Sequence, residues 1–118
     1  MKMNNINKKQ LNEYLDIFGH RKMQGLLRDY LADSTKSWEN LDKSSLTEKR
    51  RIFHCWRSNS LVFGMEDFSK LCTKIEDDPI NNRFTKASEL ISLSKVCYQE
   101  SIMKVIAILQ EEKNENRK

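Results

Sequence analysis

The residues of this chain that are best suited to chemistry lie in the segment FHCWRSNSLVFG, which spans residues 53–64. His54 is followed by Arg57 three positions on and by Ser58 four positions on. Residues three and four apart lie on the same face of a helix, so both side chains would flank the imidazole. An imidazole can be a metal ligand, a nucleic-acid contact, a nucleophile or a buried core residue. The surrounding sequence has to distinguish these roles.

The helical wheel of this segment places His54 away from the core. Phe53, Trp56, Ser60 and Phe63 follow the three-and-four spacing of a buried stripe, and His54 lies about 100° from Phe53. The stripe of His54 itself holds Thr47, Arg50, Arg51, Arg57, Ser58 and Leu61. A buried stripe would not hold three arginines, so we predict that His54 faces solvent near the middle of a helix.

A solvent-facing imidazole suits phosphoryl chemistry. It is largely unprotonated at neutral pH and is therefore nucleophilic. The guanidinium of Arg57 could hold phosphoryl oxygens on the ring, and the small Ser58 would leave the ring face open and could donate to the same oxygens. No Asp or Glu lies one turn from His54, and paired nucleophile and oxyanion donors are not visible. Hydrolytic and acyl-transfer sites are therefore disfavoured.

Composition indicates that these residues stand on an all-α scaffold. The 118 residues include only 3 Gly and 1 Pro, and the apolar periodicity divides them into five helical segments with no repeat and no long linker. We predict a single domain over residues 1–118, with a charged tail that frays from about residue 110. The expected architecture is an antiparallel up-and-down four-helix bundle with a short N-terminal helix that caps one end.

Local signals set the ends of the predicted helices. The glycines at 19 and 64 end the first and third segments, and Ser45-Leu46-Thr47-Glu48 is a capping box that starts the third. The second segment runs from about His20 to Leu41. Apolar residues at spacings of three and four predict an inward face on each segment. In the first, second and fifth segments these faces hold Ile6, Leu11, Leu15 and Phe18; Met23, Leu27, Tyr30, Ser34, Trp38 and Leu41; and Phe84, Ala87, Ile91, Ser94, Tyr98, Ile102, Val105 and Leu109. The fourth runs from about Met65 to Glu76 and is broken by Asp77-Asp78-Pro79, and the fifth starts at about Asn82.

Cysteine usage and charge exclude several classes of protein. Three cysteines without a C-x-x-C pair make a disulfide framework or a metal site improbable. No apolar run approaches the roughly 18 residues of a membrane span, and no secretory signal is present, so we expect a cytoplasmic protein with no membrane partner. Residues 1–58 carry 12 Lys and Arg against 7 Asp and Glu. An acidic protein partner, a nucleic acid or a solvated basic face would each explain this basic half.

The segment HCWRSNSLVFGMEDFSKLCTKIE, residues 54–76, resembles the signature of histidine-containing phosphotransfer (HPt) domains. That signature reads H-x-L-K-G-S-S-x-x-x-G-x-x-x-L-x-x-x-C-x-x-L-E in outline. His54 takes the place of the phosphorylated histidine, Arg57 that of the basic residue, Ser60 that of the second small polar residue and Gly64 that of the glycine. Upstream, LDIFGHRKMQGLLRDYLADS is similar to the family's first turn and second helix. The chain departs from the pattern at three positions, Trp56, Ser58 and Asn59.

This resemblance implies a phosphorelay intermediate without kinase activity of its own. The histidine would accept a phosphoryl group from the aspartate of one receiver domain and pass it to the aspartate of another. The partners would be receiver domains of response regulators and hybrid histidine kinases. Mg²⁺ is expected on the receiver, and no metal or other cofactor is expected on this chain. Separately from the resemblance, the first residue and the charged tail favour a free-standing monomer.

The resemblance also suggests roles for individual residues. Glu76 could turn toward the second ring nitrogen of His54 and fix its tautomer. The receiver would dock on the surface around His54, whose members on the third helix are Arg50, Arg51 and Leu61. Ser60 and Gly64 would be structural parts of the motif.

Two other functions fit the same sequence. One is an HPt-like docking module that is not phosphorylated and regulates a histidine kinase or a receiver. The other, ranked third, is a small basic nucleic-acid-binding protein. We expect no nucleic-acid partner, because acidic residues are interspersed along every helix and no helix has clustered base-reading side chains.

Overall fold

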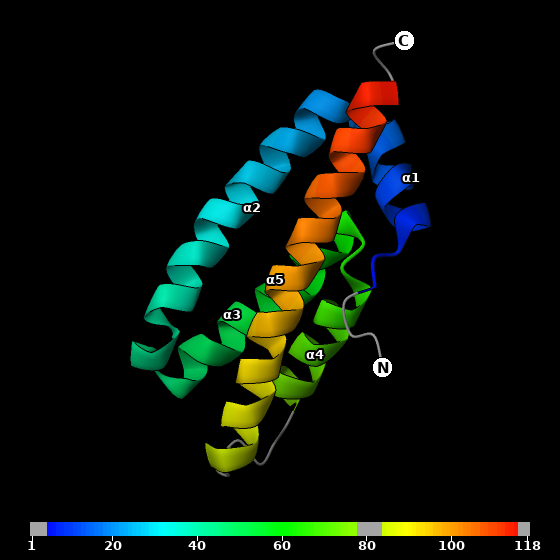
Figure 1. Cartoon of the computed structure of the whole chain (residues 1–118). Coiled ribbons are helices and arrows are strands. Elements are labelled where there is room, and N and C mark those ends of the chain that lie inside the picture. The colour runs from blue at the N-terminus through cyan, green and yellow to red at the C-terminus, as the bar shows by residue number, and fades with distance from the viewer. Residues whose placement is uncertain (1–4, 78–83, 116–118) are drawn as a thin grey trace.

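The structure, a computed structural model, describes residues 5–77 and 84–115, without the side chains of residues 77, 84–88 and 112–115. Within these ranges the chain is all-helical, with no strand, as predicted (Figure 1). None of the helices in this part of the chain is both long and apolar enough to cross a bilayer. The elements are α1 (Lys8–Phe18), α2 (His20–Asn40), η1 (Leu41–Lys43), α3 (Leu46–Asn59), η2 (Ser60–Phe63), α4 (Glu66–Asp77) and α5 (Phe84–Glu115), where η marks a short 3₁₀ helix.

The helices that carry the site pack in chain order. α3 packs along α4, and α4 packs along α5. α1 packs on η2 and on α2, and in Figure 1 it lies at one end of the longer helices. α2 meets the C-terminal half of α5, where Leu27 and Leu31 line a shared groove with Ile106 and Leu109. The hydrophobic core lies between these elements.

An aromatic cluster forms the centre of this core. Trp38 and Trp56 lie with ring centroids 4.4 Å apart, and Phe53 meets Trp56 edge-to-face at 5.1 Å. Phe68 and Tyr98 complete the cluster from α4 and α5. Offset and edge-to-face aromatic pairs add about 0.5–1.5 kcal/mol each beyond the area they bury. α3 is therefore anchored by its aromatic face, and its other face is left for solvent.

The buried stripes predicted from the sequence are largely confirmed. On α3 and η2 the four predicted core residues are buried, and so is Ile52, which the stripe did not include. Ile6, Trp38 and Ile91 are half-buried. The exception is Phe18, predicted on the inner face of the first helix but 37% exposed at the end of α1.

The predicted third helix changes its winding before it ends. It is α-helical to Asn59 and continues as the 3₁₀ helix η2 to Phe63. Gly64 then takes a left-handed conformation, with φ 70° and ψ 17°. Its carbonyl accepts a hydrogen bond from the Asn7 amide at 2.7 Å. A Cβ at this position would lie 2.5 Å from the Asn7 carbonyl oxygen, so both the backbone angle and the close approach require glycine.

The N-terminus of α3 forms half of the predicted capping box. The Ser45 hydroxyl accepts from the Glu48 amide at 3.1 Å, which satisfies one of the unpaired amides of the first turn. The Glu48 carboxylate instead pairs with Arg51 at 3.7 Å.

Two predicted boundaries near the C-terminal half fall partly outside the described residues. α4 is helical to Asp77, while Asp78, Pro79 and the predicted helix start at Asn82 are not described. α5 is helical to Glu115, so the tail predicted to fray from about residue 110 is helical as far as that residue. The side chains of Phe84 and Ala87, predicted to face inward, also lie outside the described set.

Two glycine-to-alanine substitutions should change stability in opposite directions. Gly64→Ala forces a left-handed alanine against the Asn7 carbonyl, and we expect a loss of about 2 kcal/mol or more in the free energy of unfolding. Gly25→Ala, inside α2 with no atom within 4 Å of the added Cβ, should gain about 0.5–1 kcal/mol. Urea unfolding followed by circular dichroism measures both. Equal stability of the Gly64→Ala variant and the unmodified protein would contradict the assigned role of Gly64.

Candidate functional site

His54 faces solvent from the outer side of α3. Its side chain is 56% exposed, while the preceding Phe53 is fully buried in the aromatic cluster. This is the orientation that the helical wheel predicts. The ring is therefore accessible to another molecule, and its backbone is fixed by a buried neighbour.

Glu76 reaches the His54 ring from the neighbouring helix α4. Its Oε1 atom lies 2.6 Å from the Nδ1 atom of His54. An ionised carboxylate can only accept hydrogen bonds, so Nδ1 carries the proton and donates it. The second ring nitrogen, Nε2, then holds the unshared electron pair. Among residues 5–77 and 84–115 no hydrogen bond to Nε2 is present.

Arg57 holds Glu76 in place. Its Nη1 atom lies 3.2 Å from Oε2 of Glu76, and its Nη2 atom lies 3.4 Å from Nδ1 of His54. Because the Nδ1 proton is directed at Glu76, the contact from Arg57 to the ring is a packing contact rather than a hydrogen bond. Oε2 of Glu76 is inaccessible to solvent and has no well-aligned hydrogen bond. The guanidinium of Arg57 is therefore the charge that compensates it. Arg57 therefore lies on the Nδ1 side of the ring.

A hydrogen bond from α4 to α3 sets the register that brings these groups together. The buried Ser69 hydroxyl donates to the Arg57 carbonyl at 2.7 Å. That carbonyl lies in the last turn of α3, where backbone acceptors lack helical partners. Ser69 precedes Glu76 by seven residues, about two turns, so both lie on the face of α4 that meets α3.

The other residues of the predicted site divide into exposed and structural groups. Arg50, Arg51 and Ser58 are exposed around His54, and Leu61 is half-buried at the start of η2. Ser60 is fully buried, and Gly64 forms the turn described above. Of the predicted site residues, Arg57 and Glu76 are the ones that the described part of the chain brings to within hydrogen-bonding distance of the His54 ring.

Buried hydroxyls connect α2 to the site's scaffold. The Ser60 hydroxyl bonds the Tyr30 hydroxyl at 2.6 Å, and Ser34 bonds both the Tyr30 carbonyl and the Tyr98 hydroxyl. Burial raises the pKa of Tyr30 above its ordinary value of 10.0, and the hydrogen bond with Ser60 offsets this only in part. The phenol therefore stays protonated and ties α2 to η2. Periodicity placed Tyr30 and Ser34 in the core but gave no sign of these bonds.

The cysteines are the other side chains of this chain with thiol or metal-binding chemistry. All three cysteines are thiols, and burial raises the pKa of Cys72 and Cys97. In the part of the chain that the structure describes, no three His, Cys, Asp or Glu side chains are grouped as a metal site.

Comparisons with protein-family models, with curated proteins and with solved structures find no match for this chain. The resemblance to HPt domains therefore stays a prediction, and function has to be argued from the geometry around His54.

The tautomer of His54 provides a direct test of this geometry. At a pH where the ring is neutral, we expect long-range ¹H–¹⁵N NMR spectra to show a protonated Nδ1 and an unprotonated Nε2. Glu76→Ala removes the acceptor that selects this tautomer and should raise the population with a protonated Nε2. Glu48→Ala, an acid on α3 that contacts Arg51 and not the ring, is the matched control. A protonated Nε2 in the unmodified protein would show that Glu76 does not set the tautomer.

Proposed function

We propose that this protein is a phosphorelay intermediate that carries a phosphoryl group on Nε2 of His54. The group comes from the aspartyl phosphate of one receiver domain and passes to the aspartate of another. The observation that carries the proposal is the exposed imidazole whose Nδ1 lies 2.6 Å from Oε1 of Glu76, an arrangement that leaves the electron pair on Nε2. The resemblance of residues 54–76 to the HPt signature points to the same chemistry.

The proposed step is a displacement at phosphorus. A bond forms between Nε2 and phosphorus as the bond from phosphorus to the aspartyl oxygen breaks, and the carboxylate leaves with the electron pair. The ring gains positive charge in this step, because its Nδ1 proton remains in place. Glu76 would stabilise that charge, and the ion pair with Arg57 orients the carboxylate. The receiver would supply Mg²⁺ for the phosphoryl oxygens.

The proposed scaffold is the antiparallel up-and-down four-helix bundle of α2, α3, α4 and α5. Three observations support this topology. The chain reverses at Gly64, α3 packs along α4 and α4 along α5, and α1 lies against η2. The bundle would present His54 at mid-helix, where a receiver can approach from the side.

The proposed docking surface surrounds the ring. Arg50, Arg51 and Ser58 are exposed on the same side of α3 as His54, and Leu61 adds a half-buried apolar contact. Receiver active sites are acidic, so arginines here would favour encounter with the correct partner. We propose that the protein acts in the cytoplasm as a monomer and binds receivers rather than nucleic acid.

Phosphotransfer from a labelled receiver tests the proposal. The receiver domain is first labelled on its aspartate in the presence of Mg²⁺ and then mixed with this protein. We expect transfer of a label that is acid-labile and base-stable, because it is bound to a histidine nitrogen. His54→Gln should abolish the transfer, while the control His20→Gln should retain it. Glu76→Ala should slow transfer by about tenfold or more, since the ring loses its orienting partner.

Two outcomes would contradict this function. Label that persists in the His54→Gln variant would place the phosphorylated residue elsewhere. Binding of cognate receivers without any transfer would instead assign the protein to the docking modules.

A further inference from the structure

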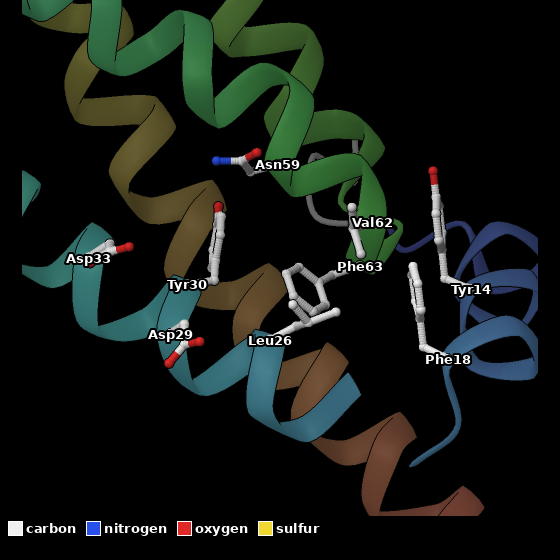
Figure 2. A pocket seen from close by; sticks show the side chains of 9 residues that line it. All are labelled: Tyr14, Phe18, Leu26, Asp29, Tyr30, Asp33, Asn59, Val62 and Phe63. Atoms are coloured by element: carbon white, nitrogen blue, oxygen red, sulfur yellow. The ribbon is translucent and has the colours of Figure 1, made fainter. Parts of the chain in front are cut away.

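An open hollow lies between α1, α2 and the η2 end of α3 (Figure 2). We call it the α1–α2 hollow. Its volume is about 380 Å³, within the roughly 300–1,000 Å³ range of small-molecule sites. None of the residues in contact with the His54 ring lines it. Its chemistry is therefore separate from the proposed phosphoryl site.

Aromatic and aliphatic side chains form most of its walls. Tyr14 and Phe18 of α1 are stacked with ring centroids 6.0 Å apart, and Figure 2 shows them side by side on one wall. Tyr30 and Phe63 meet across the base at 5.3 Å, next to Leu26. The hollow explains why Phe18 is exposed although its spacing predicts a core residue. Tyr30 and Phe63 are buried, so the accessible ring faces are those of the half-buried Tyr14 and of Phe18, which is 37% exposed. These faces could take an apolar or cationic group.

The polar part of the lining is acidic. Asp29 and Asp33 stand four residues apart on α2, on the wall of the hollow (Figure 2). Like charges at this spacing repel each other on a helix. Within the described part of the chain neither carboxylate has an ion-pair partner, and no Lys, Arg or His lines the hollow. The hollow thus combines aromatic faces with two carboxylates whose repulsion a bound cation would relieve.

We propose that the α1–α2 hollow binds a small organic cation, an amine or quaternary ammonium with an apolar body. The body would lie against Leu26 and Phe63, and the ammonium group would lie beside Asp29 and Asp33. Asn59, on the opposite wall, adds one neutral hydrogen-bonding group. The protein already places an ammonium group on one of these rings, because Nζ of Lys22 lies 5.3 Å from the ring centroid of Phe18.

Probes of equal shape and different charge test this proposal. Benzyltrimethylammonium and benzylsulfonate are titrated separately into the full-length protein, and ¹H–¹⁵N NMR spectra are recorded. We expect saturable shifts with the cation in residues 26–33 and 59–63, and no saturable shifts with the anion. Raising the NaCl concentration from 50 to 500 mM should weaken the binding of the cation, because both carboxylates are partly solvated.

Substitutions then test whether the carboxylates of Asp29 and Asp33 bind the cation. The double variant Asp29→Asn, Asp33→Asn keeps the shape of both side chains and should weaken cation binding at least fivefold. Glu39→Gln, an exposed acid on the same helix that does not line the hollow, is the control and should leave it unchanged. Leu26→Lys would bring an ammonium group into the hollow and should abolish probe binding. Circular dichroism of each variant confirms that it is folded.

Three results would overturn the proposal. The first is equal binding of the sulfonate, and the second is unchanged cation binding by the folded double variant. The third is a concentration-dependent dimer in sedimentation experiments that Leu26→Lys abolishes, which would assign the hollow to a second copy of the chain.

Discussion

The left-handed backbone at Gly64 is the constraint on which the geometry around His54 depends. It reverses the chain between α3 and α4. The Asn7 carbonyl occupies the position that a side chain at residue 64 would take. His54 precedes this turn by ten residues and Glu76 follows it by twelve. The 3₁₀ helix η2 rises more per residue than an α-helix. The path along the helix axis is therefore about 16 Å from His54 to Gly64 and about 18 Å from Gly64 to Glu76. The two side chains therefore meet at the same height of an antiparallel helix pair.

The parts of the molecule that follow from local periodicity could be predicted from the sequence. The helices, the turn at Gly64 and the outward direction of His54 depend on residues close in the chain, so spacing alone indicates them. The contact between His54 and Glu76 joins residues 22 positions apart, and periodicity carries no information on that distance. Glu76 could be named only from the HPt signature, and its position beside Nδ1 depends on the bond between Ser69 and Arg57.

Other features arise only when three or more elements pack together. The sequence placed Ser60 on the buried stripe, but it gave no sign that the helix becomes a 3₁₀ helix there or that the Ser60 hydroxyl bonds the Tyr30 hydroxyl. Phe18 has the spacing of a core residue, yet it is 37% exposed and lines the α1–α2 hollow beside Tyr14. No motif or spacing in the sequence singles out Asp29 or Asp33. Only the placement of α1 against η2 shows that they line an aromatic hollow.

The most direct test of the central claim is the position of the phosphoryl group on the ring. The protein, labelled with ¹⁵N at histidine, is incubated with phosphoramidate as the phosphoryl donor, which removes any need for a cognate receiver. The expected result is a single phosphohistidine at His54 with ³¹P–¹⁵N coupling to Nε2 and a proton retained on Nδ1. Coupling to Nδ1, or a phosphoryl group on any other residue, would contradict the assigned roles of both His54 and Glu76.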